Sequence, residues 1–333
     1  MRALRLAVLL ALLCLTAGGA QAGRLEAIKA RGHLTCGVLP GVTGFAILKP
    51  DDTYSGFDID TCRAVAAAIF GTPDKVKFIQ ADDVGIFKRQ PDVDVVIRRL
   101  TWTLTRETPL GLMFGPITYY DGQGLMVPAG VANVEALAGK SICVEQGEGW
   151  AGNLARYSQT RDLDMKPVVA TDRADAIKRF LAGDCTAYSG DKTMLASIRA
   201  GLPRPMDYVI LPDEFSKEPL APLVRQGDDR FFEIVRWTIL ALIEAEELHI
   251  TSSNVGVFAI SQNPDSQHFL GLAPGNGKAL GLNEGWARNV IKAVGNYGEM
   301  FARNLGPDSA VKLDRGLNRL WTEGGLMYAP PLR

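Results

Sequence analysis

The pattern of apolar and polar positions predicts alternating short strands and helices in the first third of the chain. Apolar residues recur at helical spacing over 58–70, whereas short β-branched runs before and after it are typical of buried strands. The expected strands are 33–38, 76–80 and 93–97, and the expected helices are 58–70 and 82–89. Strand, helix, strand, helix, strand is the order of a parallel sheet covered by helices.

The same order appears a second time further along the chain. The second copy consists of strands at 141–145, 167–170 and 185–189 and helices at 150–157 and 172–182. The sequence therefore predicts two similar α/β units, each with a parallel sheet.

Two extended segments connect these units. The first is the glycine-rich stretch 115–124, in which glycine permits large changes in φ and ψ, and the second is 219–225. Together they predict two Rossmann-like lobes joined by a pair of hinge strands. We expect the first lobe to comprise 23–121 with 227–333, and the second lobe to comprise 122–226.

Three further helices are predicted after the second unit. The apolar residues of 228–247 recur at helical spacing, and shorter patterns follow at 284–305 and 310–321. These segments add C-terminal helices to the first lobe.

The N-terminus reads as a secretory signal peptide. Arg2 and Arg5 precede an apolar run over 6–15, and small residues follow up to Ala22. We expect cleavage after Ala22, export to the periplasm and a mature chain that begins at Gly23. No later apolar run is long enough to predict a membrane span.

Charge and cysteine content narrow the possible functions. The formal net charge of −1 gives no indication of a nucleic-acid partner. Beyond the predicted signal peptide lie Cys36, Cys62, Cys143 and Cys185, an even number in an exported chain, which favours disulfides. Of the three possible pairings, the two-unit organisation favours Cys36 with Cys62 and Cys143 with Cys185. Free buried thiols are the alternative.

The usual catalytic and metal-binding motifs do not occur in the sequence. It has no Gly-x-Ser-x-Gly, His-Glu-x-x-His, Walker loop or Cys-x-x-Cys, and its three histidines are scattered. The run 147–152 formally matches a dinucleotide fingerprint, with Asp172 about twenty residues on. A carboxylate at Glu148 opposes that interpretation, and a helix N-terminus suited to a small ligand is the other one. We predict no catalysis, metal or cofactor.

Candidate ligand-binding groups follow the third strand of each unit. Arginine and threonine side chains crowd the segment 98–106, and Asp191 follows the third strand of the second unit. An arginine fork suits a carboxylate, and an aspartate suits an ammonium group, so Arg106 and Asp191 together would bind a zwitterion. The alternative for the segment 98–106 is an ordinary polar loop after its strand. The alternative for Asp191 is a side chain that caps the helix beginning at Lys192.

Several blocks of sequence resemble the family 3 solute-binding proteins of polar amino-acid ABC transporters, and more narrowly their general L-amino-acid-binding branch. The resembling blocks are 54–60, 101–106, 118–124, 217–229, 294–299 and 328–333. The resemblance implies a two-lobed periplasmic binding protein of the type II clamshell class, monomeric, which delivers an L-amino acid to a membrane permease.

The resemblance also implies roles for individual residues. Arg106 would hold the ligand's α-carboxylate and Asp191 its α-ammonium group. Thr101 would add contacts with Thr103 close by, and an aromatic ring at Phe45 would cover the ligand. The remaining contact to the carboxylate would come from the glycine loop at Gly149.

Three residues depart from the family pattern at this site. Arg99 and Leu100 stand where the branch usually has asparagine and threonine, and Glu148 stands where a hydroxyl residue is usual. A carboxylate at Glu148 would repel the ligand's carboxylate unless it turns away or pairs with Arg99. These changes motivate an alternative hypothesis, a repurposed protein of this fold that acts as a sensor or partner-binding module. A third, a prephenate-type dehydratase, has only Glu148 as a candidate acid.

Overall fold

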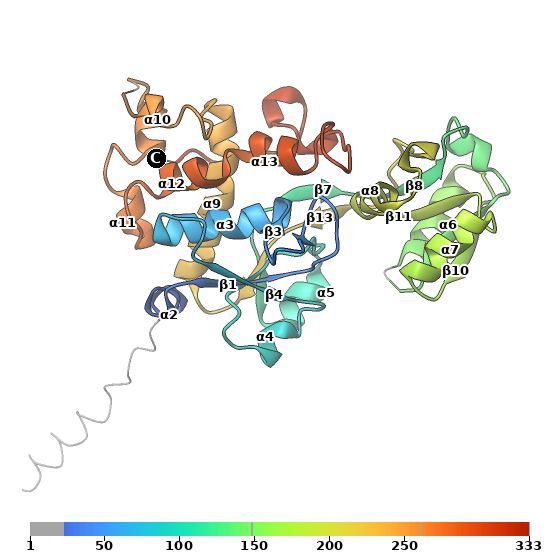
Figure 1. Cartoon of the computed structure of the whole chain (residues 1–333), viewed down its shortest axis with the longest axis horizontal. Helices are drawn as coiled ribbons and strands as arrows, with labels where there is room; N and C mark the ends of the chain where they lie inside the picture. The colour runs from blue at the N-terminus through green and yellow to red at the C-terminus, as the bar shows by residue number, and fades with distance from the viewer. Residues whose placement is uncertain (1–22, 148, 261, 333) are drawn as a thin grey trace, which may run out of the picture.

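The computed structural model describes residues 23–147, 149–260 and 262–332. The predicted signal peptide, 1–22, and Glu148 therefore lie outside the described residues. The chain forms two lobes, each built on its own five-stranded sheet, and a separate pair of short strands connects them. Figure 1 shows the lobes side by side, with this pair between them. The two-lobed α/β architecture predicted from the sequence is confirmed.

The first lobe contains a mixed sheet in the order β4-β1-β5-β14-β6. Strand β1 pairs in parallel with β4 and β5, whereas β14 lies antiparallel between β5 and β6. The bounds are β1 Leu34–Val38, β4 Val76–Gln80, β5 Val95–Val96, β6 Leu112–Phe114 and β14 Leu223–Arg225. Because β14 belongs to this sheet, the chain re-enters the first lobe before residue 227, where the sequence placed the boundary.

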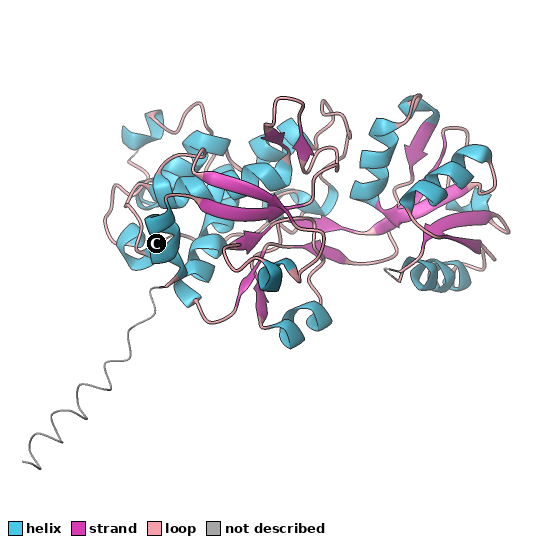
Figure 2. Ribbon diagram, turned by 60° about the horizontal axis from the view of Figure 1, so that its bottom comes forward, coloured by secondary structure: helices cyan, strands magenta, loops and turns pink. Residues whose placement is uncertain are grey.

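Helices cover the sheet of the first lobe, as Figure 2 shows for both lobes. Helix α3 is buried along nearly its whole length and ends at Gly71, whose φ of 78° closes the last turn. A disulfide joins Cys62 of α3 to Cys36 of β1, with the Cα atoms 6.2 Å apart. The helices are α2 Arg24–Arg31, α3 Phe57–Phe70, α4 Ile86–Arg89, α5 Leu104–Glu107 and α9 Asp229–Glu247, and a hairpin of β2 Ile47–Leu48 and β3 Tyr54–Ser55 precedes α3.

The second lobe repeats this design with the sheet order β10-β9-β11-β8-β12. Strand β9 pairs in parallel with β10 and β11, and β8 lies antiparallel beside β11. The bounds are β8 Gln123–Pro128, β9 Ser141–Glu145, β10 Lys166–Ala170, β11 Ala187–Asp191, β12 Tyr208–Ile210, α6 Trp150–Thr160, α7 Arg173–Ala182 and α8 Lys192–Gly201. The Cα atoms of Cys143 and Cys185 lie 5.5 Å apart in the second disulfide, so both predicted pairings are confirmed.

The connection between the lobes is an antiparallel pair of strands, β7 Tyr119–Asp121 and β13 Glu218–Leu220. Tyr120 lies opposite Pro219 in a pair that does not hydrogen-bond, because the Pro219 carbonyl points away from β7 and accepts from the Trp102 amide at 2.8 Å. Instead, the carboxamide of Asn318 meets the outer edge of β7: it accepts from the Tyr120 amide at 2.7 Å and donates to the Tyr120 carbonyl at 3.0 Å. Asn318 thus satisfies both backbone groups that the hinge ladder leaves unpaired at Tyr120.

The C-terminal region differs from the predicted helices in two places. The helix expected over 284–305 is interrupted at Gly295, with φ of 82°, and Asn296 starts a new helix through a capping box with Glu299. The helix predicted over 310–321 is wrong, because that segment is extended with two short 3₁₀ turns. The side chain of Asn318 bonds to the hinge, and that of Arg315 bonds to Glu246 of α9. The elements are α10 Pro264–Phe269, α11 Asn276–Leu280, α12 Trp286–Val294, α13 Tyr297–Asn304, η5 Gly316–Asn318 and η6 Trp321–Glu323.

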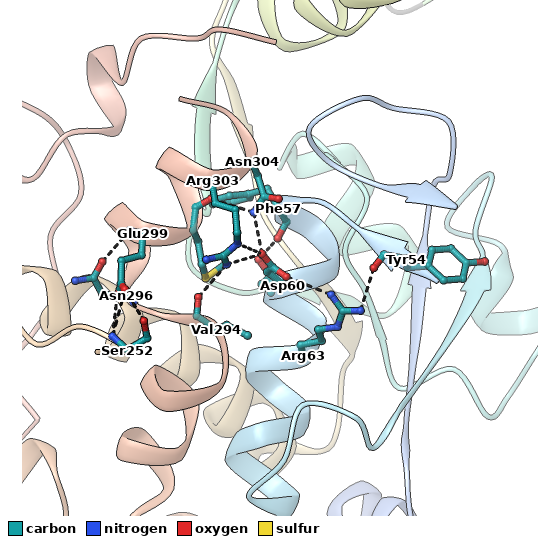
Figure 3. A network of polar contacts seen from close by, with 12 residues as sticks. Tyr54, Phe57, Asp60, Arg63, Ser252, Val294, Asn296, Glu299, Arg303 and Asn304 are labelled. Carbon is teal, nitrogen blue, oxygen red and sulfur yellow. Dashed lines mark hydrogen bonds and ion pairs between the residues drawn. The ribbon is translucent and has the colours of Figure 1, made fainter. Parts of the chain in front are cut away.

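Helix α13 is joined to α3 by buried charge. The carboxylate of Asp60, on α3, accepts from the Arg303 guanidinium at 2.6 Å and from the Asn304 amide at 2.8 Å (Figure 3). Asp60 is 7 % exposed, whereas the Arg303 side chain is 48 % exposed, so these charge-assisted bonds link a buried carboxylate to a guanidinium at the surface. The C-terminal helices are consequently an integral part of the first lobe, and they hold α3 and the hinge in a fixed relation.

Candidate functional site

The first-lobe part of the site is the segment that leaves β5 toward the hinge. Thr103 caps α5, its hydroxyl accepting from the Arg106 amide at 3.2 Å. The Arg106 guanidinium donates to the Thr101 carbonyl, also at 3.2 Å. The Thr101 hydroxyl in turn donates to Glu218 of hinge strand β13 at 2.8 Å. A short helix and its cap therefore hold half-buried Arg106 beside the hinge.

Arg99 spans the two lobes. Its backbone has φ of 55°, a conformation that costs energy in a residue with a side chain. Its guanidinium lies over the Phe45 ring, 5.4 Å from the centroid, and donates to the Thr193 hydroxyl of α8 at 3.1 Å. Pairing with Glu148, one of the possibilities raised by the sequence, lies outside the described residues. The contact with Thr193 ties the first lobe to the first turn of α8.

Phe45 lies beneath this guanidinium rather than at a surface. Its side chain is 1 % exposed and packs edge-on against Phe57 and Tyr119, with centroids 6.2 and 5.9 Å away. The structure therefore places Phe45 in the core, as a platform for Arg99.

Arg98, Arg99 and Arg106 concentrate positive charge at this end of the first lobe. Burial lowers the pKa of Arg98, and the charges of Arg99 and Arg106 lower it further. The Nε of Arg98 is buried and has no hydrogen-bond partner among the described residues. Such a cluster favours an anionic group nearby, because an anion relieves the mutual repulsion.

In the second lobe, Asp191 ends β11 and occupies the position before α8. Within the described part of the chain, its side chain accepts no capping hydrogen bond from the first turn of that helix. Its Oδ1 instead accepts from the indole Nε1 of Trp150 at 3.0 Å. The capping alternative is therefore not what the structure contains.

Asp121 of the hinge takes over the capping role. Its carboxylate accepts from the Thr193 hydroxyl and, at 3.4 Å, from the Thr193 amide, and the Lys192 amide donates to the Gly122 carbonyl at 2.9 Å. The first amides of α8 are therefore satisfied from the hinge strand and not by Asp191.

Two buried carboxylates lie around this network. Burial raises the pKa of Asp58 to about 7 against the opposing effect of Arg99 and Arg98. Burial also raises the pKa of Asp121 to about 7, and the nearby Asp191 charge adds to the shift, while bonds from Thr193 and Gly122 oppose it. The charge of Arg99 therefore favours the ionised form of both carboxyls, but burial outweighs that effect.

The glycine loop before α6 has the backbone that only glycine adopts readily. Gly147 and Gly149 have φ of 104° and 78°, and neither has a described atom within 4 Å of the place that a side chain would occupy. The loop therefore leads into the first turn of α6 without obstruction from its neighbours.

Four site residues were not identified from the sequence: Asp121, Gln123, Trp150 and Thr193. Asp121 and Gln123 lie in the predicted hinge and could have been marked as its only strongly polar side chains. Trp150 and Thr193 carry no local signal, because their partners lie 41 and 72 residues away.

No group of three or more histidine, cysteine or acidic residues able to hold a metal ion occurs among residues 23–147, 149–260 and 262–332. Over the same residues, no helix is both long and apolar enough to cross a membrane.

Two lobes of matching topology on a two-strand hinge, with cationic groups on one lobe and a carboxylate on the other, define the class of two-lobed periplasmic binding proteins. More particularly, the chain belongs to the bacterial extracellular solute-binding proteins, family 3, whose model matches residues 34–254.

Relatives resemble nearly the whole chain. The general L-amino acid-binding periplasmic protein AapJ of Rhizobium johnstonii is 47 % identical over 330 residues, covering 97 % of this chain and 96 % of AapJ. The glutamate/glutamine/aspartate/asparagine-binding protein BztA of Rhodobacter capsulatus is 46 % identical over 328 residues, 97 % of either chain. A solved periplasmic binding protein from Brucella ovis with glutathione bound is 45 % identical, with a TM-score of 0.85 over 94 % of this chain and 100 % of that one.

Proposed function

We propose that this protein is the periplasmic substrate-binding component of an amino-acid ABC importer. It closes its lobes on a free L-amino acid and delivers it to a membrane permease, as a monomer and without catalytic turnover. Residues 1–22 direct its export and are removed by cleavage after Ala22. The observation that supports the proposal is that Asp121 and not Asp191 caps α8, which is consistent with a role for the Asp191 carboxylate in ligand binding.

The zwitterionic head of the ligand matches the charges on the two lobes. Arg106 receives the α-carboxylate, assisted by Thr101, Thr103 and the amides that follow Gly149. Asp191 receives the α-ammonium group across the hinge. Carboxylate and guanidinium form parallel charge-assisted bonds, which gives this end of the ligand both affinity and orientation. We assign Arg99 to lobe-to-lobe contact, since Thr193 and Phe45 already engage its guanidinium.

A γ-glutamyl peptide is a second candidate ligand. The Brucella ovis neighbour holds glutathione, and the glutamyl end of glutathione carries an α-ammonium and an α-carboxylate group like those of a free amino acid. The same pair of charged residues would bind that end, and the remainder of the peptide would extend between the lobes.

Thermal unfolding of residues 23–333, with the disulfides intact, tests both candidates. A ligand that binds only the native state stabilises it by about 2.7 kcal/mol at a hundredfold excess over Kd. We expect L-amino acids, glutathione or both to raise the Tm of the wild type. Arg106→Ala and Asp191→Asn should abolish that rise.

A matched pair of control variants is available on the surface of the second lobe. Arg204 and Asp207 form an exposed ion pair, and Arg204→Ala and Asp207→Asn should keep the wild-type response. A wild type that responds to neither class of ligand, or site variants that respond like the controls, would overturn the proposal.

A further inference from the structure

Trp150 lies at the start of α6, directly after the glycine loop. Its side chain is 6 % exposed, and its indole donates to Asp191 Oδ1 at 3.0 Å. An indole N–H can only donate, so its natural partner in a buried place is an acceptor such as a carboxylate. The bond joins the N-terminus of one helix to the residue that precedes another.

The backbone of Trp150 is fixed as well. Its carbonyl accepts from the side-chain amide of Gln123 at 3.0 Å, and the same amide donates to the Ser189 hydroxyl at 2.9 Å. Gln123 is completely buried and lies opposite Asp191 in the β8–β11 ladder. Gln123, Trp150 and Asp191 thus form a closed ring of contacts across two strands and a helix.

We infer that Trp150 is a positioning residue that fixes the Asp191 carboxylate for the ligand's ammonium group, an inference that rests on the proposed function. A carboxylate offers about four acceptor sites, so one bond from an indole sets its orientation and is compatible with a further donor. Preorganisation of this kind strengthens binding because the carboxylate loses little freedom when the ligand arrives. A role in packing alone would support the lobe without any preference for the ammonium group.

Trp150→Phe tests the inference, because it removes the N–H donor and keeps an aromatic ring in the core. Calorimetry would compare each amino acid with the 2-hydroxy acid of the same skeleton: L-alanine with L-lactate, and L-glutamate with L-2-hydroxyglutarate. In each pair only the ammonium group is exchanged for a hydroxyl. We expect Trp150→Phe to weaken amino-acid binding roughly 5- to 30-fold, the range of one charge-assisted hydrogen bond, and to leave the hydroxy acids within about twofold.

Trp321→Phe is the matched control. Trp321 lies in the C-terminal segment, is 52 % exposed and packs against Tyr328, so the substitution removes an indole N–H outside the site and keeps an aromatic ring. This variant should retain wild-type affinities for all four compounds.

A second measurement keeps the inference testable if Trp150→Phe does not fold. In ¹⁵N spectra of the indole groups, Asp191→Asn and addition of L-glutamate or L-alanine should each shift the resonance of Trp150. Equal weakening of amino and hydroxy acids by Trp150→Phe, or an unmoved indole resonance, would overturn the positioning role alone. A wild type that binds neither amino acid would overturn the proposed function and this inference together.

Discussion

Replacing Asn318 by alanine should remove the hydrogen bonds that connect the hinge to the C-terminal segment. The substitution removes both bonds between the Asn318 carboxamide and the backbone of Tyr120, which have lengths of 2.7 and 3.0 Å. Both backbone groups of Tyr120 point away from Pro219, the residue opposite on the other hinge strand. One donor and one acceptor in the hinge would therefore lose their only partners among the described residues.

The size of the effect follows from the burial of these groups. Leaving a buried donor or acceptor unsatisfied costs about 1–3 kcal/mol. Asn318 is 2 % exposed, but Tyr120 is half-buried, so water can reach part of the vacated edge. We therefore take about 1 kcal/mol for each of the two groups, the lower end of that range, and expect a loss of about 2 kcal/mol in local stability.

Hydrogen exchange measured by mass spectrometry reads this loss directly at the Tyr120 amide. A loss of about 2 kcal/mol corresponds to roughly 30-fold faster exchange when local opening limits the rate. Asn133→Ala serves as the control, because Asn133 caps an exposed 3₁₀ turn in the second lobe and should leave Tyr120 unchanged. Wild-type exchange of Tyr120 in Asn318→Ala would refute the reasoning, since the bonds could not then be what protects the hinge.

Three further predictions concern stability. Burial raises the pKa of Asp58 to about 7 from 3.8, so the folded state retains a proton that the unfolded chain releases above about pH 4. The contribution of Asp58 to stability should fall as pH rises from about 4 to about 7, and Asp58→Asn should flatten the urea midpoint over that window; an unchanged slope would contradict this. Replacing Cys143 and Cys185 together by serine opens a crosslink with a sequence separation of 42 and should cost about 4 kcal/mol in urea unfolding, and an unaltered midpoint would refute that estimate. Gly56→Ala places a Cβ 2.1 Å from a backbone carbonyl oxygen at φ of 132°, and should lower the Tm more than Gly111→Ala, where φ is 64° and the described surroundings leave room; equal losses would argue against a steric cause.

The order of elements could be predicted because the apolar residues of each strand and helix in the two units follow the spacing typical of that element. The disulfide pairing followed from that order, since each cysteine pair lies within one unit. The helix predicted over 310–321 failed for a different reason. Its apolar spacing is compatible with a helix, but Lys312 has φ of 52°, and Arg315 and Asn318 bond to groups far away in sequence. Tertiary contacts decided the conformation there.

The site was predictable to the extent that its residues follow strand ends. Arg106 and Asp191 were predicted as ligand-binding residues in this way, and in the structure each has a partner on or next to the hinge. The connection between Asp191 and Trp150 could not be inferred, because it depends on how α6 and β11 meet in space. The sequence could not show that Asp121, and not Asp191, caps α8, since either aspartate has the chemistry of a cap.

The position of β14 has a consequence for how the molecule is made. This strand fills the gap between β5 and β6, and its residues follow the whole second lobe in the chain. A ribosome or export channel that releases the chain from its N-terminus delivers all five strands of the second sheet, up to Ile210, before Leu223 appears. The second lobe can thus complete its sheet and its Cys143–Cys185 crosslink while the first sheet is still missing a central strand. Completion of the first sheet, and of the contact between Asn318 and the hinge, therefore requires residues that are delivered after the whole second sheet.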